Sequence, residues 1–486
     1  IFYSHLTILS VLITFHRAIH FICLSFILFH FYVKKAMTRL IKIVCYYGSW
    51  AAYRQGLGQF EATDIDPNLC THIIYTFVGI SEDGDVRILD SWLDLPNGRD
   101  GYGKFIRLRQ LSPETKALIA IGGWNEGSTK YSNVVANPNV RARFVQNVIR
   151  FLKTYNFDGF DLDWEYPNQR GGKPADKENY IALLKELREE FDKHGYILSV
   201  AVAAAEVSAS KSYLISQLSQ YPHIINLIAY DLNGSWNNFA AINNSSVQYW
   251  LAQGAPADKL ILGVPAYGRS FTLSNSAYNT VGSSTIGPGK IGPYTRESGM
   301  LGYNEICEYI KQGWTVQREP EQRVPYAFKD NQWVGYDDVI SLEEKAKYVM
   351  SNGLGGMMMW SVETDDFHGT CGDKYPLLHS INRVLKGDIS SPSPTSTPTR
   401  LPKPDSSTVT KPSSTSSTTV LPSSTPSDSI CTKEGFVRDP KDCSVFYYCQ
   451  LAYNKYLINK FLCPSGLVFD TSTHTISPSL RTQSEC

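Results

Sequence analysis

Eight short apolar segments alternate with amphipathic ones along residues 41–363, and this alternation constrains the fold more than any other feature of the chain. Near-continuous apolar strands are typical of a parallel sheet that is covered on both faces. The intervening segments, such as residues 139–155 and 176–195, place apolar side chains at helical spacing. Eight strand–helix repeats predict an α/β fold, a (β/α)8 TIM barrel. The eight expected strands lie in IKIVCYY, THIIYTFVG, KALIAIGGW, FDGFDLDWEY, YILSVAVAA, IINLIAYDL, KLILGVPAYG and GGMMMWSVE.

One connection is too long for a simple barrel. Residues 268–338, between the seventh and eighth expected strands, are rich in Gly, Tyr and Thr and contain strand-like pieces of their own. Loops of this length are uncommon unless they carry their own structure. We therefore expect a small α+β insertion between strands 7 and 8.

A change in composition divides the chain into a large body and a small tail. Residues 388–429 are almost entirely Ser, Thr and Pro, so they cannot form a core and are expected to be a linker. It separates a barrel at 41–387 from a tail at 430–486. Five of the ten cysteines lie in this tail, which predicts a small disulfide-rich β module made in an oxidising compartment. None is spaced as CxxC, so we expect no metal site there.

The first forty residues form an apolar leader. Residues 6–33 are strongly apolar, contain His16, Arg17 and His20, and are followed by two lysines. This pattern fits a cleaved signal sequence or an uncleaved membrane anchor. The alternative is an artefact of the gene model, with Met37 as an internal start.

The charge balance excludes some classes of partner. The chain has 46 basic and 46 acidic residues, so its net charge does not favour binding to nucleic acid or to an anionic membrane. Aromatic residues make up 12% of the chain. They fit either stacking surfaces for sugars or a tyrosine-rich core.

Residues 158–167, DGFDLDWEYP, combine three carboxyl groups with the alternation of a strand. This alternation places Asp161, Asp163 and Glu165 on one face and the apolar residues between them on the other. Glu165 then lies at the carboxyl end of the strand, where barrel enzymes have their active sites. Mutual repulsion is expected to raise the pKa of at least one carboxyl and keep a proton available near neutral pH. The string predicts a general acid, because a purely structural acidic strand would be costly to bury.

The same string matches the DxxDxDxE signature of the family 18 chitinases, which the chain resembles over essentially the whole body. Other blocks of that family occur in the same order. They are YYGSW at 46–50, GGWN at 122–125, AYDLNGSW at 229–236, PAYGRSF at 265–271, GMLGYNEIC at 299–307 and MMMWSVETDD at 357–366. The resemblance implies a secreted, extracellular, monomeric endo-chitinase of arthropod type that acts on chitin and chitooligosaccharides.

The resemblance also implies roles for the acidic residues. In this family the substrate's own 2-acetamido carbonyl replaces the second catalytic carboxylate. Glu165 would protonate the glycosidic oxygen and later deprotonate the water. Asp163 would hold the acetamido N–H, Asp161 would share charge with Asp163, and Tyr230 would donate to the acetamido carbonyl. The expected outcome is retention of the β configuration without any metal or organic cofactor.

Other matching positions are expected to bind the sugar chain. Trp360 resembles the aromatic floor at the cleavage point, and Trp50, Trp92 and Trp124 resemble stacking surfaces along the cleft. Ile228 and Asn233 depart from the residues most frequent in the family, which bears on cleft shape and pH optimum. The remaining expected contacts are Tyr46, Gly122, Gly123, Asn125, Tyr166, Ile228, Ala229, Asp231, Tyr267, Arg269 and Met358. Sequons at Asn233, Asn243 and Asn244 are candidate glycan sites.

The cysteines of the body and the tail also follow family patterns. The resemblance implies disulfides between Cys45 and Cys70 and between Cys307 and Cys371. The tail resembles the peritrophin-type chitin-binding module, but Ile476 occupies the place of its fifth cysteine. The family connectivity would leave Cys463 unpaired, and a lost bridge in so small a domain typically costs about 2–5 kcal/mol. The tail pairs implied are Cys431 with Cys449 and Cys443 with Cys486.

Two other functions fit the same sequence. A chitin-binding lectin on this fold arises when the acid is replaced, but Glu165, Asp163 and Tyr230 are all present. An enzyme for the chitobiose core of N-linked glycans is disfavoured by the chitin-binding tail and by an insertion that would deepen the cleft. An endo-acting chitinase is therefore the preferred interpretation.

Overall fold

The computed structural model describes residues 41–232 and 246–387 in full, together with the backbone of five strands between residues 435 and 478. The chain divides into two compact units, Ile1–Thr395 and Ser396–Cys486. The predictions for the leader, for the linker and for Asn233, Asn243 and Asn244 lie outside the described residues. Within the described part of the chain, no helix is both long enough and apolar enough to cross a membrane.

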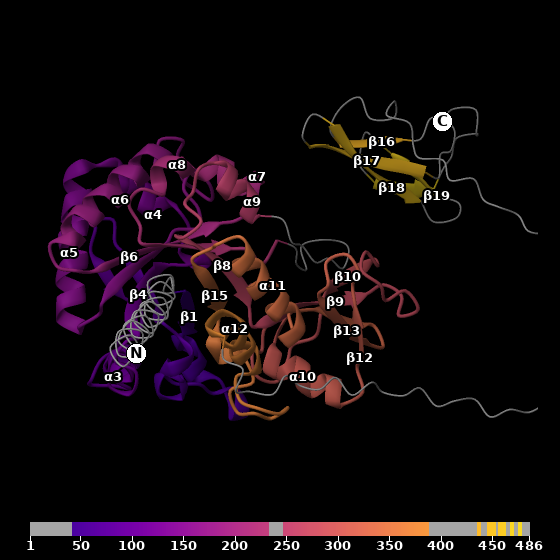
Figure 1. The fold of residues 1–486 in the computed structure, drawn as a ribbon, viewed down its shortest axis with the longest axis horizontal. Coiled ribbons are helices and arrows are strands. Elements are labelled where there is room, and N and C mark those ends of the chain that lie inside the picture. Colours follow the sequence, from indigo (N-terminus) through magenta and orange to yellow (C-terminus); the bar gives the residue numbers. More distant parts are fainter. Residues whose placement is uncertain are drawn as a thin grey trace, which may run out of the picture. The chain divides into compact units, whose positions relative to one another are not determined.

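A closed barrel of eight parallel strands forms the body (Figure 1). The first strand pairs with both the second and the last, which closes the sheet and confirms the predicted TIM barrel. A short strand, β3 (Val86–Ile88), pairs antiparallel with the last three residues of the second strand. The barrel strands are β1 (Lys42–Gly48), β2 (His72–Ile80), β4 (Lys116–Gly122), β5 (Gly159–Asp163), β6 (Ile197–Ala203), β7 (Ile224–Ile228), β8 (Leu260–Pro265) and β15 (Gly356–Trp360).

Helices cover the outside of the barrel, and the main core lies between them and the strands. The helix α5 illustrates how the sequence starts and ends such an element. The Asn137 side chain accepts hydrogen bonds from two backbone N–H groups of its first turn, Pro138 follows, and Asn156 ends it with φ of 60°. The helices are α2 (Ser91–Asp94), α3 (Gly101–Leu111), α4 (Thr129–Ala136), α5 (Pro138–Tyr155), α6 (Asp176–Asp192), α7 (Glu206–Ser212), α8 (Ile215–Leu218), α9 (Val247–Ala252), α11 (Val339–Ser351) and α12 (Pro376–Lys386).

The interior of the barrel holds a second, smaller cluster. Val44, Ile74, Leu118 and Met358 are among its members, and each comes from a different strand. Buried polar side chains share this space, including Asp161, Ser199 and Asn226, none of which has exposed surface. Parallel strands therefore bury both of their faces here, as their near-continuous apolar character predicts.

The residues between β8 and β15 in the sequence form a second sheet beside the barrel, where the α+β insertion is predicted (Figure 1). Its six antiparallel strands and one helix occupy residues 267–335. One face buries Phe271 and Trp333, and the other packs Leu301 and Val334 near the helix. The elements are β9 (Tyr267–Leu273), β10 (Thr285–Pro288), β11 (Met300–Gly302), α10 (Tyr303–Lys311), β12 (Thr315–Arg318), β13 (Pro325–Lys329) and β14 (Gln332–Gly335).

The tail unit contains a three-stranded antiparallel sheet and a separate hairpin. The predicted β module is thus present at the level of the backbone. The implied tail disulfides lie outside what is described, because only the backbone of Cys449 is defined. The sheet consists of β16 (Gly435–Arg438), β17 (Val445–Ala452) and β18 (Lys455–Leu462), and the hairpin of β19 (Leu467–Asp470) and β20 (Thr475–Pro478).

Two disulfides occur in the body, and they are the pairs that the resemblance implies. Cys45 of β1 is bonded to Cys70, and Cys307 of α10 is bonded to Cys371. The second bridge ties the insertion to the segment that follows β15. Both bridges limit how far these loops separate in the unfolded chain.

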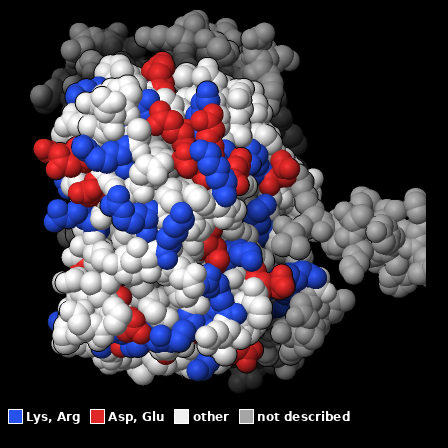
Figure 2. All heavy atoms as spheres, turned by 90° about the vertical axis from the view of Figure 1, so that its left-hand side faces the viewer, with Lys and Arg blue, Asp and Glu red and all other residues white. Residues whose placement is uncertain are grey.

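The charged surface agrees with the neutral charge balance. Figure 2 shows Lys and Arg interspersed with Asp and Glu, without a broad area of one sign on that face. Arg141 of α5, for example, pairs with Glu186 of α6 at 2.7 Å. That face therefore lacks the basic surface that nucleic-acid binding requires.

Gly122, at the end of β4, generates a prediction about stability. Its φ is 115°, and a Cβ there would lie 2.1 Å from the Asp163 carbonyl oxygen of β5. Gly122→Ala should therefore lower the free energy of unfolding by several kcal/mol, because both strands would have to move. Gly195→Ala is the control, since its φ is 70° but no atom lies within 4 Å of the added Cβ. It should cost only about 1–2 kcal/mol.

Urea unfolding followed by tryptophan fluorescence measures both variants. Equal losses of stability for Gly122→Ala and Gly195→Ala would contradict this account of the packing between β4 and β5.

Candidate active site

The carboxyl end of β5 carries the acidic string, with its alternate residues on opposite sides of the barrel wall. Phe160 and Leu162 join the core between strands and helices. Asp161 and Asp163 are 0% and 4% exposed, and Glu165 follows the strand in a partly buried position. Asp158, the first acidic residue of the string, instead pairs with Arg109 at 2.6 Å and accepts from the Ala117 N–H. Asp158 therefore stabilises the start of β5 and is not part of the site.

Asp161 is held by side chains from three other strands. The Tyr46 hydroxyl of β1 donates to its Oδ2 at 2.7 Å. Asn226 of β7 donates to the Tyr46 oxygen at 3.1 Å and to the Ser199 oxygen of β6 at 3.0 Å. Burial raises the Asp161 pKa to about 6, although hydrogen bonds from Ser199, Tyr46 and Asn226 act to lower it. The contact of β5 with β1 and β7, which are not its neighbours in the sheet, places this network inside the barrel.

Ser199 and Asn226 are site residues that our sequence analysis missed. Each is a polar residue flanked on both sides by aliphatic residues in an expected strand, YILSVAVAA or IINLIAYDL. A lone polar residue in a strand buried on both faces is costly unless it is hydrogen-bonded. That cost is the signal that would have identified them.

Asp163 is a buried carboxyl group with one oxygen that has no hydrogen-bond partner in the described part of the chain. Among the described residues, no group donates a hydrogen bond to its buried Oδ1. Burial raises its pKa well above the usual value, and the negative charges of Glu165 and Asp161 raise it further. Buried acceptors are normally satisfied, so this oxygen is suited to a donor that a ligand brings.

Glu165 has the protonation expected of a general acid. Burial raises its pKa to about 7, the Asp231 charge adds to this, and Tyr166 and Arg170 oppose it. Our sequence analysis attributed raised pKa values to repulsion between the carboxyls. That expectation is corrected, because burial is the largest cause of the raised pKa at Asp161, Asp163 and Glu165. Repulsion by other carboxyl groups is the second cause at Asp163 and a smaller cause at Glu165. A carboxyl with such a pKa is partly protonated at neutral pH.

Tyr230 lies just beyond β7, beside Met358 of β15. Its hydroxyl is 3.8 Å from the Met358 sulfur, and its ring meets that of Tyr267 edge-on at 6.3 Å. Burial raises its pKa well above the usual value, as do the charges of Asp163 and Glu165. The hydroxyl therefore keeps its proton and remains a donor. The partly buried Ile228 and Ala229 precede it in the chain.

Asp231 and Arg269 form a two-pronged ion pair across the junction of the barrel and the insertion. Arg269 Nε donates to Asp231 Oδ1 at 2.7 Å, and Nη2 donates to Oδ2 at 2.5 Å. The guanidinium also lies 5.2 Å from the ring centroid of the buried Tyr267. This pair attaches β9 of the insertion to the loop that carries Tyr230.

Four aromatic rings form a continuous floor. Trp360 lies 5.4 Å from Tyr46, 6.3 Å from Trp50 and 5.8 Å from Phe77, measured between ring centroids. Phe77 of β2 also stacks on Trp50 at 6.2 Å, and our sequence analysis did not identify it. Trp50 is 43% exposed, so part of the floor faces solvent.

The structure does not bring Trp92 and Trp124 into this floor. They are 61% and 59% exposed, and no ring contact joins either to it among the described residues. Asn125, next to Trp124, is also exposed. Gly123 fixes the loop that carries them: its N–H donates to the Asp163 carbonyl at 2.9 Å, and a Cβ at its φ of 81° would lie 2.6 Å from the Phe77 ring.

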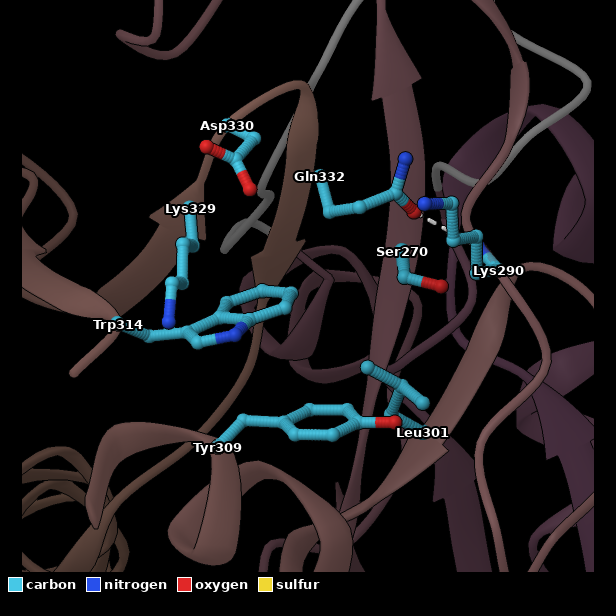
Figure 3. Close-up of a pocket in the computed structure, with 8 residues that line it drawn as sticks. All are labelled: Ser270, Lys290, Leu301, Tyr309, Trp314, Lys329, Asp330 and Gln332. Atoms are coloured by element: carbon cyan, nitrogen blue, oxygen red, sulfur yellow. Dashed lines mark hydrogen bonds between the residues drawn. The ribbon is translucent and has the colours of Figure 1, made fainter. Parts of the chain in front are cut away.

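A separate hollow of about 220 Å³ opens in the insertion (Figure 3). The rings of Tyr309 and Trp314 stack on one side of it, with centroids 5.1 Å apart. Ser270 lines it, and alternation along β9 places Ser270 on the opposite face from Arg269. The hollow is therefore not part of the acidic site. Its other lining residues are Lys290, Leu301, Lys329, Asp330 and Gln332.

Comparison with known families agrees with this geometry. Residues 42–365 match the glycosyl hydrolases family 18, and residues 431–475 match the chitin-binding Peritrophin-A domain. The chain is 40% identical over 412 residues to a Drosophila melanogaster protein named probable chitinase 2, covering 74% of this chain and 84% of that relative.

Two solved structures are also similar. The Ostrinia furnacalis Group IV chitinase in complex with allosamidin is 45% identical, with a TM-score of 0.70, and the match covers 71% of this chain and 99% of that one. Human YKL-39, described as a pseudo-chitinase with retained chitooligosaccharide binding properties, is 36% identical, with a TM-score of 0.66. That match covers 71% of this chain and 100% of YKL-39. The fold is thus shared by proteins described as chitinases and by one described as a pseudo-chitinase.

The network around Asp161 generates a prediction that depends on pH. Asn226→Asp would place a second carboxyl where the Asn226 amide nitrogen now lies 3.5 Å from Asp161 Oδ1, without changing the size of the side chain. Two buried carboxylates cannot both ionise at low cost, so the new group should have a raised pKa in the folded state. Its penalty should then grow as the pH rises from about 4, where the group begins to ionise in the unfolded chain.

Urea unfolding of Asn226→Asp and wild type at pH 5 and pH 8 measures this effect. The loss of stability should be larger at pH 8. Asn139→Asp, at the exposed start of α5, is the control and should change little at either pH. An equal loss for Asn226→Asp at both pH values would rule out the buried network as described.

Proposed function

Because the chain belongs to the glycosyl hydrolases of family 18, we propose that it is a secreted, endo-acting chitinase that cleaves β-1,4-linked N-acetylglucosamine polymers with retention of configuration. The Peritrophin-A match at residues 431–475 supports chitin as the polymer. The names of its relatives, among them probable chitinase 2 and the Group IV chitinase, support the same substrate class.

The observation that carries the proposal is the combination of two buried acidic groups, Asp163 and Glu165, that interact electrostatically. Within the described residues, Asp163 has an unpartnered buried oxygen, and Glu165 has a pKa of about 7. A 2-acetamido group carries one N–H donor and one carbonyl acceptor. Asp163 Oδ1 would accept that N–H, and the Tyr230 hydroxyl would donate to the carbonyl oxygen. This arrangement suits substrate-assisted cleavage.

In the first proposed step, the acetamido carbonyl oxygen attacks the anomeric carbon and forms an oxazolinium ring. The bond from that carbon to the glycosidic oxygen breaks, and Glu165 gives its proton to the departing oxygen. Asp163, whose charge is shared with Asp161 through the buried pair, stabilises the positive ring. In the second step, Glu165 takes a proton from water, the water oxygen bonds to the anomeric carbon, and the ring opens. Two inversions at one carbon give net retention.

The surroundings of the acid support a long, neutral substrate. Within the aromatic floor, Trp50, Phe77 and Trp360 offer faces on which sugar rings stack, and the buried Tyr46 packs against Trp360. All of these residues come from one chain, so we propose that a monomer is sufficient for activity. The disulfides and the tail family support action outside the cell.

Replacement of Glu165 tests the proposal directly. Glu165→Gln keeps the size of the side chain but removes the proton that it donates, so turnover of soluble chitooligosaccharides should fall by about 100-fold or more. NMR of the products, taken before mutarotation, should show the β anomer for the wild type. Glu114→Gln, in an exposed turn, is the matched control and should retain full turnover.

The same experiment distinguishes the lectin alternative. If the wild type binds the oligomers but does not cleave them, this chain functions as YKL-39 is described, and the enzymatic proposal fails.

The pH dependence of the reaction provides a second test. Glu165 must hold its proton to act as an acid, and its pKa is raised to about 7. The value of kcat/KM should therefore be highest below pH 7 and fall about tenfold per pH unit well above it. Initial rates on a soluble oligosaccharide between pH 4 and pH 9 measure this limb. A profile that stays flat up to pH 9 would show that Glu165 is not the titrating acid.

A further inference from the structure

Arg170, a residue outside the family 18 signature, contacts both the exposed Trp124 and the backbone of the acid. Its guanidinium carbon lies 3.6 Å from the Trp124 ring centroid. Its Nη1 donates to the Trp124 carbonyl at 2.7 Å and to the Glu165 carbonyl at 3.0 Å. One planar cation thus joins the loop after β4 to the segment after β5.

The backbone of this segment is held in an uncommon conformation. Arg170 and Asn168 have φ of 50° and 58°, which costs non-glycine residues roughly 1–2 kcal/mol each. The buried Asp176 stabilises the turn by accepting from the N–H groups of Asn168 at 3.1 Å and Lys173 at 2.7 Å. Such conformations persist where the surroundings impose them, often at functional sites. The turn therefore fixes the backbone from which the Arg170 side chain projects.

The Trp124 loop is fixed from its other side by Glu126. One carboxylate oxygen accepts from the Ile80 N–H at 3.0 Å, and the other accepts from the Tyr131 hydroxyl at 2.7 Å. These bonds hold the loop through the Glu126 side chain, but Trp124 itself is 59% exposed. Among the described residues, Arg170 is the one cation that lies over that ring. It covers one face of the indole.

We infer that Arg170 is a positioning residue that holds the Trp124 ring as a stacking surface for a sugar and couples it to the Glu165 peptide. This inference rests on the proposed function. A cation on one face of an indole orients the ring, so less conformational freedom is lost when a pyranose stacks on the other face. The two hydrogen bonds of Arg170 hold the Trp124 loop at a fixed position relative to Glu165.

The charge of Arg170 can be tested through the pH dependence of kcat/KM, which the loss of a purely structural residue would not shift. It opposes the rise in the Glu165 pKa, as the Tyr166 hydrogen bond does, whereas Asp231 adds to the rise and Asp163 is charge-coupled to Glu165. Loss of the charge should therefore move the alkaline limb of kcat/KM to higher pH. A lysine at the same position should leave the limb where it is.

The test compares Arg170→Gln and Arg170→Lys with Lys173→Gln. Lys173 is an exposed cation of the same turn whose ammonium bonds to Asn133 instead. With chitohexaose, Arg170→Gln should raise KM about three- to tenfold with a smaller change in kcat, and shift the alkaline limb upward. Arg170→Lys should raise KM less and leave the limb unchanged, and Lys173→Gln should match the wild type.

A double-mutant cycle with Trp124→Ala isolates the coupling. Calorimetry of chitohexaose binding, in chains that also carry Glu165→Gln, keeps this arm independent of turnover. Arg170→Gln should weaken binding when Trp124 is present and have no further effect in Trp124→Ala. An equal weakening in both backgrounds, or no weakening in either, would overturn the inference. An inactive wild type with the predicted binding cycle would instead overturn the proposed enzymatic function alone.

Discussion

The burial of carboxyl groups inside the barrel is the constraint on which the rest of the site depends. Asp161 and Asp163 lie almost without solvent contact in an interior that also holds a cluster of apolar side chains. Such groups are costly unless they are neutralised or hydrogen-bonded. For Asp161 the compensation comes from Tyr46, Ser199 and Asn226. Among the described residues, Asp163 keeps an oxygen without a hydrogen-bond partner, and Glu165 has a raised pKa. These two groups can therefore interact with a substrate and transfer a proton.

Closure of the barrel is what brings these groups together. β1, β5 and β7 are not neighbours in the sheet, yet side chains from all three meet across its interior. The loops beyond the strands add the outer parts of the site in the same way. Gly123 bonds to the Asp163 carbonyl, and Asp231 bonds to Arg269 of the insertion. The acid, the aromatic floor and the insertion are thus linked through a few short contacts.

The contact of Arg170 with Trp124 and Glu165 extends this linkage to the surface of the molecule. Exposed aromatic side chains can adopt many orientations, and a neighbouring cation reduces that freedom. The orientation of Trp50 is restricted in a different way, because its ring packs on Phe77 and Trp360. Trp50 and Trp124 are therefore oriented by different physical means, Trp50 by stacked rings and Trp124 by a cation.

The sequence by itself determined the barrel, the insertion and the acidic string, because apolar periodicity and the two-residue alternation of a strand are local properties of the chain. It did not determine which polar residues share the interior with Asp161, since Ser199 and Asn226 lie far from it in sequence. Ser199 meets it through the pairing of β5 with β6, and Asn226 reaches it from β7, which is not a neighbour of β5. Nor did it separate Trp92 and Trp124 from the floor, or reveal Phe77 and Arg170. Those assignments, and burial as the main cause of the raised carboxyl pKa values, depend on distances and solvent exclusion that only the tertiary structure decided.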